Sequence, residues 1–418
     1  MNEKILKQLN NAKEASKKLG LLPHAQRVLI LKNLTKELRK NKQLIISANA
    51  RDLKKLSRND PMRDRLFLNS ERIEGMARDI ENIIKLKDPV GEIFDCRLRH
   101  GLKICRKRVP IGVIGVVYES RPNVTTDVAA ICIKSGNVAV LKGGKEARES
   151  CITLHKIIQK ALVASRASLQ AVQFIDPKIK GSVLDIIKAD GLIDVVIPRG
   201  SSGLINFMRS NATVPIIETG AGVCHTFVDE SAKLKESAKI IFNAKTQRPS
   251  VCNSLDTLLV HKKIAETFLP VVSKLLLSKR VEIFADVKSF AILKNHYPKA
   301  LLKKAQASDF GREFLSQKMS TKVVSNVDEA ITHISKYSSK HSEAILSENK
   351  KNSQKFLDEV DASVVNVNAS TRFSDGAMFG LGGEIGISTS KIHARGPMGP
   401  QEMTTYKWIV IGKYSVRK

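Results

Sequence analysis

Residues 1–90 carry apolar side chains at helical spacing. Val28, Leu31 and Leu34 follow one another three positions apart, which places them on one face of a helix. Pro23 stands just before this run, where the first turn of a helix tolerates proline. The pattern predicts a helical segment at the start of the chain.

Two stretches are typical of exposed or terminal strands. In residues 93–108 charged and apolar side chains alternate, which predicts an exposed two-stranded ribbon. Near the C-terminus, residues 406–411 form a last apolar strand. This strand contains Trp408, the only tryptophan of the chain, and we expect Trp408 to be buried.

Between these stretches, short apolar runs alternate with helical ones. The strands predicted in a first series are residues 111–118, 137–142, 171–175, 192–197 and 214–217. The helices predicted between them are residues 124–135, 145–163, 178–188 and 200–209. Most of these strands are rich in β-branched residues and show no alternation, which is typical of a buried parallel sheet.

A second series of apolar runs begins near residue 223. Its predicted strands are residues 225–228, 256–260, 281–284, 322–324, 343–346 and 363–367, with helices between them. The βαβ rhythm predicts an α/β fold of the doubly wound kind. The chain has 418 residues, more than one hydrophobic core usually holds, so two domains are expected.

The net charge of +29 raises the alternative of a nucleic-acid-binding protein. The basic residues are spread along the chain, and only 5% of residues are aromatic, so platforms for base stacking are scarce. We therefore interpret the charge as a solvated basic surface and expect no nucleic-acid partner. Binding that falls steeply with salt, together with no turnover, would favour the alternative.

Neither a membrane nor a metal site is expected. The longest apolar run, residues 109–118, is far shorter than the roughly 20 residues that cross a bilayer. The N-terminus has no signal-peptide core, so a cytoplasmic protein is expected. The six cysteines form no CxxC pair and no zinc-like group, so we expect them all to be reduced.

The most informative segment is Lys-Thr-Gln-Arg-Pro-Ser-Val-Cys-Asn, residues 245–253. It places Cys252 near two cations, Lys245 and Arg248, and nearby positive charge lowers the pKa of a thiol and makes it a nucleophile. Pro249 disfavours helical geometry before it, so we expect Cys252 on an exposed turn. The alternative is that Cys252 is a small buried hydrophobe, as most free cysteines are.

Other candidates follow predicted strands. Asn123 precedes a helix and is either an N-cap or an amide donor to an oxyanion. Glu218 ends an apolar run, where a carboxylate is costly unless exposed, paired or functional. Gly143 and Gly144, between Lys142 and Lys145, form a turn that suits phosphate and ribose contacts, with a plain surface turn as the alternative.

Two further features do not by themselves indicate a dinucleotide site or a catalytic triad. The glycine-rich residues 380–386 miss the dinucleotide fingerprint by one position and are interpreted as a turn. His225, His341 and His393 are scattered, and no Ser-His-Asp set suggests itself.

Taken together, the motifs resemble the aldehyde dehydrogenase superfamily and, within it, the enzymes that reduce γ-glutamyl phosphate in proline biosynthesis. The resemblance covers almost the whole chain. The segments that carry it are residues 108–115, 118–123, 134–137, 197–200, 217–225, 245–253, 366–373, 379–388 and 393–399.

The resemblance implies a reaction in which Cys252 attacks the acyl phosphate of L-glutamyl 5-phosphate. The N–H of Cys252 and the amide of Asn123 would bind the oxyanion, and NADPH would reduce the resulting thioester to L-glutamate 5-semialdehyde. Glu218 matches the position of the general base in hydrolytic members, whereas here the acyl acceptor is phosphate. The rival is an NAD(P)-dependent dehydrogenase that forms an acid, with Glu218 activating water; dependence on phosphate separates the two.

The resemblance also implies binding residues. Lys142 would contact the adenosine ribose of NADP, and Lys145 would favour its 2′-phosphate. Relatives commonly have a small residue at position 145, so the alternative is a surface charge peculiar to this chain. The expected cofactor-binding set is Lys142, Gly143, Gly144, Lys145, Arg199, Gly200 and Ser201. The expected cations for the substrate carboxylate and phosphate are Arg121, Lys245, Arg248, Arg372 and His393.

The implied architecture is aldehyde dehydrogenase-like, with a Rossmann-like cofactor domain, an α/β catalytic domain and a small β arm. The NADP-binding domain would comprise residues 1–92, 111–222 and a C-terminal return, 387–405. The catalytic domain would be residues 223–386. Residues 93–110 and 406–418 would form an oligomerisation arm whose edge strands pair between subunits of a homodimer or larger homo-oligomer. The chain has no kinase domain, so transient contact with a separate glutamate 5-kinase is expected.

Overall fold

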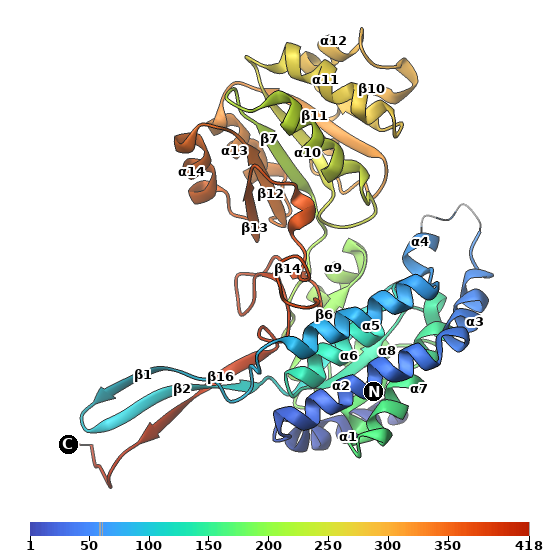
Figure 1. Ribbon diagram of the computed structural model, residues 1–418, viewed down its shortest axis with the longest axis vertical. Coiled ribbons are helices and arrows are strands. Elements are labelled where there is room, and N and C mark those ends of the chain that lie inside the picture. Colours follow the sequence, from blue (N-terminus) through green and yellow to red (C-terminus); the bar gives the residue numbers. More distant parts are fainter. Residues whose placement is uncertain (58–59, 61, 418) are drawn as a thin grey trace. The chain divides into compact units, whose positions relative to one another are not determined.

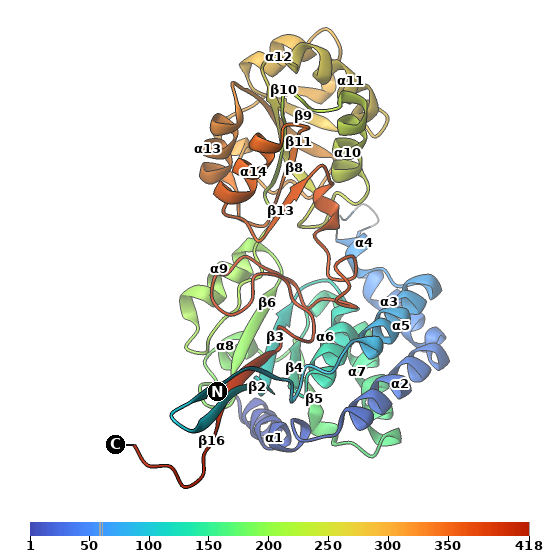
Figure 2. The ribbon, with the colours of Figure 1, turned by 60° about the vertical axis from the view of Figure 1, so that its left-hand side comes forward.

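The computed structural model describes residues 1–57, 60 and 62–417, and the chain divides into two compact units. Unit 1 comprises residues 1–219, 379–386 and 390–418, and unit 2 comprises residues 220–378 and 387–389. Figures 1 and 2 show the elements of both units. The division into cofactor, catalytic and arm domains stays a prediction, because the units reflect packing and not bound ligands.

Unit 1 contains a parallel sheet with the strand order β5-β4-β3-β6. The strands are β3 (Val113–Tyr118), β4 (Val138–Lys142), β5 (Val172–Phe174) and β6 (Val195–Arg199). From β3 the chain moves outward to β4 and β5 and then crosses to β6 on the other side of β3. The carboxyl ends of β3 and β6 therefore flank the point at which strand order reverses, where ligands bind in folds of this class.

Helices cover this sheet. The N-terminal helices are α1 (Glu3–Leu19), α2 (His24–Lys40), α3 (Lys42–Leu53), α4 (Arg63–Leu66) and α5 (Ser70–Lys85). Helices α6 (Val124–Lys134), α7 (Arg148–Ala164), α8 (Ser182–Ile187) and α9 (Ser202–Asn211) follow individual strands, with 3-10 turns η1 (Lys145–Ala147) and η2 (Leu169–Ala171). The predicted helical start and βαβ order are thereby confirmed. In Figure 2, α6 and α7 lie on one side of the sheet and α8 and α9 on the other.

The predicted strand at 214–217 is wrong. Of these residues only Ile216 bridges to the sheet, opposite Val196, and no regular strand forms. Pro215 supplies a carbonyl to the N–H of Val196 but has no N–H of its own to continue the ladder. The main-chain N–H of Val214 turns instead to the carbonyl of Ile187.

Unit 2 contains a parallel sheet with the order β10-β9-β11-β8-β7-β12-β13. Its strands are β7 (Cys224–Val228), β8 (Leu255–His261), β9 (Glu282–Ala285), β10 (Leu302–Lys304), β11 (Lys318–Val324), β12 (Ser342–Leu346) and β13 (Val364–Val367). All the strands predicted in the second series form, and β10 is added to them. Leu258 and Val260 pack into one core and Leu259 into another, because alternate side chains of a strand face opposite sides of its sheet.

The helices of unit 2 cover both of these cores. They are α10 (Leu234–Thr246), α11 (Ala265–Leu277), α12 (Val287–Leu293), α13 (Val327–Tyr337) and α14 (Lys350–Glu359). Short 3-10 turns are η3 (Lys299–Leu301), η4 (Ala307–Asp309) and η5 (Thr371–Phe373), and the two-residue strands β14 (Ile387–Ser388) and β15 (Gly396–Pro397) belong to the C-terminal part of the chain. Figure 2 shows α13 and α14 on the opposite side of the sheet from α10 and α11.

An antiparallel ribbon completes unit 1. It consists of β1 (Ile93–Arg99), β2 (Leu102–Pro110) and β16 (Thr404–Ile411), with β2 in the middle, and it extends away from the helices of this unit in Figure 1. The predicted ribbon and the predicted last strand are therefore confirmed. In the described part of the chain, no helix is long and apolar enough to cross a membrane.

The expected burial of Trp408 is wrong. Its side chain lies on edge strand β16, and the residue is 47% exposed. The guanidinium of Arg106 lies 4.6 Å from the centre of its ring, and that of Arg97 lies 5.6 Å away. The half-exposed indole ring of Trp408 therefore packs against two guanidinium groups, and cation–π attraction stabilises these contacts.

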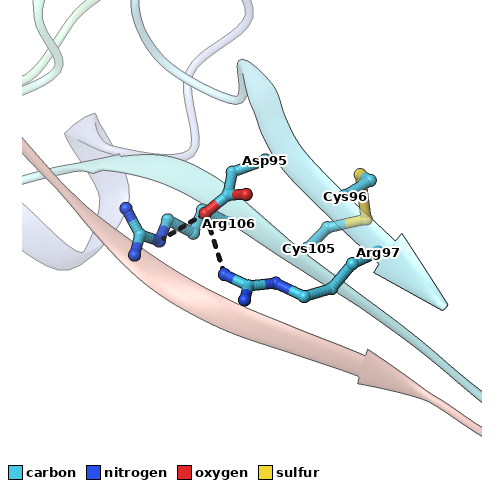
Figure 3. Close-up of a disulfide and its surroundings, with 5 residues drawn as sticks. All are labelled: Asp95, Cys96, Arg97, Cys105 and Arg106. Atoms are coloured by element: carbon cyan, nitrogen blue, oxygen red, sulfur yellow. Dashed lines mark hydrogen bonds and ion pairs between the residues drawn. A yellow bond between two sulfur atoms is a disulfide. The ribbon is translucent and has the colours of Figure 1, made fainter. Parts of the chain in front are cut away.

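The expectation of six reduced cysteines is also wrong, because Cys96 and Cys105 form a disulfide (Figure 3). The two residues lie opposite one another on β1 and β2, at an irregularity of the ladder between Phe94 and Arg97. Asp95 beside them pairs with Arg97 and Arg106, each at 3.2 Å. Their spacing of nine residues gave no sign of this pairing, which depends on the register of the hairpin.

We expect protein purified without reductant and then denatured to show four reactive thiols: Cys132, Cys151, Cys224 and Cys252. Addition of a reductant should raise the number to six. Titration with a chromogenic disulfide reagent measures both numbers, and Cys96→Ser with Cys105→Ser should give four under either condition. Six reactive thiols before reduction would show that the hairpin holds two separate thiols.

Candidate active site

The predicted cofactor-binding residues all follow the carboxyl ends of strands in unit 1. Lys142 ends β4, Arg199 ends β6, and Tyr118 at the end of β3 lies opposite Arg199 in the register. Since parallel strands end at the same edge, the loops after β3, β4 and β6 meet there. The structure therefore brings the predicted set of residues 142–145 and 199–201 to one edge of the sheet.

Two glutamates organise this edge, and sequence analysis missed both. Glu119 accepts a hydrogen bond from the N–H of Ser201 at 2.7 Å, and Glu146 accepts from the N–H of Ser120 at 2.6 Å. A Cβ on Gly200 would lie 2.5 Å from Glu119, and one on Gly144 would lie 2.0 Å from Glu146. The two glycines therefore make room for carboxylates that bind loop backbone, and Glu119 within the motif Tyr-Glu-Ser-Arg was the available signal.

The two lysines of this edge differ in environment. Lys142 is partly buried, and burial lowers the pKa of its ammonium group, opposed by the carboxylate of Glu146. Lys145 is exposed at the start of the 3-10 turn η1. A partly buried cation beside an exposed one fits a ligand that carries anionic groups, as a nucleotide does.

Asn123 directly precedes helix α6 but makes no side-chain cap. Its Nδ2 donates to the carboxylate of Asp127 at 2.8 Å, one turn further along. An amide nitrogen carries two hydrogens, so the second remains for another acceptor. Asn123 is thus the N-cap residue of α6 by position, without a capping side-chain bond, and a role as donor to an oxyanion stays a prediction.

Asp127 is the unusual acid of unit 1. Burial raises the pKa of its carboxyl group to about 7, with the carboxylate of Asp79 acting in the same direction and the hydrogen bond from Asn123 opposing it. Near neutral pH this group exchanges a proton while it holds the amide of Asn123. Sequence analysis did not single it out, because an aspartate in the first turn of a helix is commonplace.

Glu218 lies on a partly exposed segment of unit 1, outside any strand. Its carboxylate lies 3.8 Å from the guanidinium of Arg209 in α9, and its side chain is 31% exposed. Exposure and a cation therefore remove the cost expected of a carboxylate at this position. A base role for Glu218 stays a prediction.

Cys252 in unit 2 lies on a turn between α10 and β8, closed by the N–H of Ser254 donating to the carbonyl of Val251 at 3.1 Å. The thiol residue is partly exposed, as predicted, and is not a core hydrophobe. The following residue is fixed on both sides. Asn253 Nδ2 donates to the carbonyl of Ser374 at 2.9 Å, and Thr371 Oγ1 donates to the carbonyl of Asn253 at 2.8 Å.

Lys245 does not point to solvent. Its side chain is fully buried, Nζ donates to the carbonyl of Leu255 at 2.8 Å and lies 3.6 Å from Asp256. Burial lowers the pKa of Lys245 and raises that of Asp256 to about 6, while each charge opposes the shift of the other. This buried position does not support the predicted contact of Lys245 with substrate. Instead, Lys245 stabilises the backbone after the Cys252 turn by donating to the carbonyl of Leu255.

The other predicted substrate cations are distributed between the units. In unit 2, Arg372 in η5 bonds to the side chains of Gln247 and Asn253, and burial lowers the pKa of its guanidinium. Arg248 is exposed on the same turn as Cys252. In unit 1, Arg121 follows β3, and His393 is exposed, with its Nε2 2.6 Å from the carbonyl of Glu402. Unit 2 thus contains the partly exposed thiol and two of the predicted guanidinium groups, of which Arg372 interacts electrostatically with Cys252.

The remaining histidines have structural surroundings. His225 is fully buried, with its Nδ1 3.2 Å from Glu343, and His341 bonds to Ser342 at 2.8 Å. Within the described residues, no three His, Cys, Asp or Glu side chains are placed to hold a metal ion.

We expect Asp127→Asn to stabilise the protein at pH 8 but not at pH 5. The pKa of Asp127 is about 7 in the folded state, so the carboxyl group keeps its proton up to that pH, whereas the unfolded chain loses it near the ordinary aspartate pKa of 3.8. Stability contributed by this group is therefore present at low pH and is lost as the pH rises through this window. Asparagine has no charge and still accepts from Asn123.

The measurement is the melting temperature of both proteins between pH 5 and pH 8. The advantage of Asp127→Asn should grow by several degrees, on the order of 2 kcal/mol of stability. Asp190→Asn, at an exposed position, is the matched control and should give a difference that does not vary with pH. A constant difference for both variants would contradict the raised pKa.

Comparison with known proteins places this geometry in a family. A model described as "Aldehyde dehydrogenase family" matches residues 1–286. A γ-glutamyl phosphate reductase of Chlorobium phaeobacteroides is 46% identical over 418 residues, which is 100% of each chain. The crystal structure of γ-glutamyl phosphate reductase from Thermotoga maritima superposes with a TM-score of 0.92 at 45% identity and covers 99% of both chains.

A more distant structure shares only the fold. An engineered glycolyl-CoA reductase with bound NADP⁺ is 16% identical, with a TM-score of 0.71 over 97% of this chain and 96% of its own. The expected aldehyde dehydrogenase-like α/β fold is confirmed by these structures. The family model and the full-length relatives show that this chain belongs to the aldehyde dehydrogenase family and is an oxidoreductase of that family.

Proposed function

We propose that this protein reduces L-glutamyl 5-phosphate to L-glutamate 5-semialdehyde and phosphate with NADPH, the second step of proline biosynthesis from glutamate. The observation that carries the proposal is the turn of Cys252, with its partly exposed thiol and the guanidinium groups of Arg248 and Arg372 in the same unit. The substrate follows from the γ-glutamyl phosphate reductases that match the chain over its full length.

In the proposed reaction the Cys252 thiolate attacks the acyl carbon of the substrate. The bond from this carbon to the phosphate oxygen breaks, phosphate leaves, and a thioester remains on Cys252. The N–H of Cys252 and the second N–H of Asn123 would stabilise the oxyanion formed at the carbonyl. Arg248 and Arg372 would bind the phosphate or the carboxylate of the substrate, since guanidinium groups bind both. Arg121 and His393 remain further candidates for these anions.

The carboxyl edge of the unit 1 sheet fits a dinucleotide. It lies where the strand order reverses, and it offers Lys142, Lys145 and the loop of residues 199–201. When bound, NADPH supplies the hydride that reduces the thioester carbon. The thiolate of Cys252 then leaves, and the aldehyde is released. Glu218 has no required part, because phosphate and not water is the acyl acceptor in the reverse direction.

The proposal also covers the roles of the two units, the assembly of subunits and the location in the cell. Unit 1 without the ribbon would bind NADP, unit 2 would carry the thiol chemistry, and the ribbon of residues 93–110 and 406–418 would join subunits of a homo-oligomer. Val410 and Ile411 on edge strand β16 are 57% and 58% exposed, which suits pairing with another strand. A cytoplasmic location and transient contact with a glutamate 5-kinase would fit a labile acyl-phosphate substrate.

The test measures the rate of NADP⁺ reduction in the reverse direction. Glutamate 5-semialdehyde is the substrate, and the rate is compared with and without inorganic phosphate. We expect turnover that requires phosphate and falls roughly 10³-fold or more in Cys252→Ala, because the nucleophile is lost. Cys132→Ala removes a buried thiol of α6 and should keep the rate within a few-fold. Turnover without phosphate would instead indicate an enzyme that hydrolyses the thioester, with Glu218 as base.

The cofactor preference tests Lys145. We expect Lys145→Glu to raise the KM for NADPH about tenfold or more relative to that for NADH, because a carboxylate repels the 2′-phosphate. Lys188→Glu makes the same charge change on an exposed residue after α8, before the amino end of β6, and should leave the ratio unchanged. Equal effects of the two variants would assign Lys145 to the general basic surface.

A further inference from the structure

The segment before β7 passes unusually close to the turn of Cys252. A Cβ on Gly222 would lie 1.5 Å from the carbonyl oxygen of Cys252 and 2.4 Å from its carbon. No side chain fits there, so the backbone of Gly222 packs directly on that peptide group. This approach lies within unit 2 and fixes one side of the turn.

Cys224, two residues further along, bonds to the same peptide group. Its Sγ–H donates to the carbonyl oxygen of Cys252 over 3.1 Å. Cys224 is fully buried and pairs with Leu255 in the register of β7 and β8, and the ladder shifts immediately afterwards, between Cys224 and His225. Irregularities of this kind re-aim a side chain, and this one lies next to the candidate nucleophile.

The segment is itself anchored. The N–H of Gly222 donates to Glu313 at 3.0 Å, and the N–H of Val223 donates to Ser339 Oγ at 2.8 Å. Beyond the turn, Thr371 holds the carbonyl of Asn253, and Lys245 holds that of Leu255. The carbonyls of residues 252, 253 and 255 thus each accept from a side chain, and Cys224 supplies the bond at the candidate nucleophile itself.

We propose that Cys224 is a positioning residue whose thiol fixes the carbonyl of Cys252 and so aims the sulfur and the N–H of Cys252 at the substrate. This inference rests on the proposed function of Cys252 as nucleophile. A fixed carbonyl limits rotation of the Cys252 backbone. Small displacements of a reacting group cost large factors in rate, so such a bond affects catalysis without touching substrate.

The surroundings of Cys224 keep its thiol protonated, so that it can donate a hydrogen bond. Burial raises the pKa of its thiol well above the ordinary value, and the carboxylates of Glu343, Asp256 and Glu313 act in the same direction. The thiol of Cys224 therefore keeps its proton near neutral pH and does not compete with Cys252 for an electrophile.

The test compares Cys224→Ala, which removes the donor, with Cys224→Ser, which keeps an O–H donor at the same place. We expect Cys224→Ala to lower kcat of the phosphate-dependent reverse reaction about tenfold or more, with KM changed less than about threefold. Cys224→Ser should recover most of the loss. Cys132→Ala, the matched loss of a buried thiol, should leave kcat within a few-fold of the wild type.

A second readout needs no substrate. Alkylation of Cys252 by iodoacetamide is followed by peptide mapping between pH 6 and pH 9. In Cys224→Ala the midpoint of the pH profile should move upward and the rate at pH 7 should fall, because the thiolate is no longer held toward the guanidinium groups of its unit. Cys224→Ser should restore both. Melting curves identify any variant that does not fold, and Gly222→Ala, which displaces the same carbonyl by a clash, then takes its place.

Two results would overturn the inference. One is a Cys224→Ala protein that matches the wild type in kcat and in the alkylation profile. The other is a Cys224→Ser protein as impaired as Cys224→Ala, which would mean that the thiol only fills space. If the wild type shows no phosphate-dependent turnover, the proposed function fails, whereas the alkylation profile still decides the part of Cys224.

Discussion

The parallel direction of the strands is the constraint on which the candidate residues of each unit depend. In unit 1 it collects the loops after β3, β4 and β6 at one edge, so that residues 119–123, 142–146 and 199–201 become neighbours. In unit 2 the parallel strands instead bring residues together at the amino edge of the sheet. Cys224 begins β7 and the Cys252 turn immediately precedes β8, so the thiols meet at the amino edge of that sheet. Each unit thus gathers its chemistry at one end of its sheet.

Polar groups of these edges are used mainly to hold backbone in place. Glu119 and Glu146 bind loop N–H groups, and Lys245 and Thr371 bind carbonyls around the Cys252 turn. Burying such groups is costly unless they are paired. Their pairing with main chain therefore makes the loops rigid, and a rigid loop is what a nucleophile and an oxyanion donor require.

The sequence patterns predicted well where strands and helices follow one another along the chain. They predicted poorly which individual side chains are buried or paired. Runs of β-branched residues predicted the buried strands of both sheets, and Pro249 predicted the turn of Cys252. Both predictions succeeded because these patterns act on the local backbone. Pro215 shows the limit: an apolar run resembles a strand until a missing N–H interrupts its ladder. The burial of Trp408 and the six reduced cysteines were mispredicted, because exposure and hairpin register depend on how strands pair in the fold and not on the local residue pattern. The burial of Lys245 was not foreseen for the same reason. The hydrogen bond of Cys224 to Cys252 spans 28 residues and was equally invisible.

Two thiols in one unit show how surroundings separate chemistry from structure. Cys224 and Cys252 are linked by a hydrogen bond, yet Cys224 is fully buried near carboxylates, whereas Cys252 is partly exposed and interacts electrostatically with the guanidinium of Arg372. Negative neighbours and burial keep a proton on sulfur, whereas positive neighbours favour its loss. The same side chain is therefore a hydrogen-bond donor at one position and a candidate nucleophile at the other. A basic surface spread over the chain would act on both thiols alike, so the difference between them depends on burial and on the charged groups of their own surroundings.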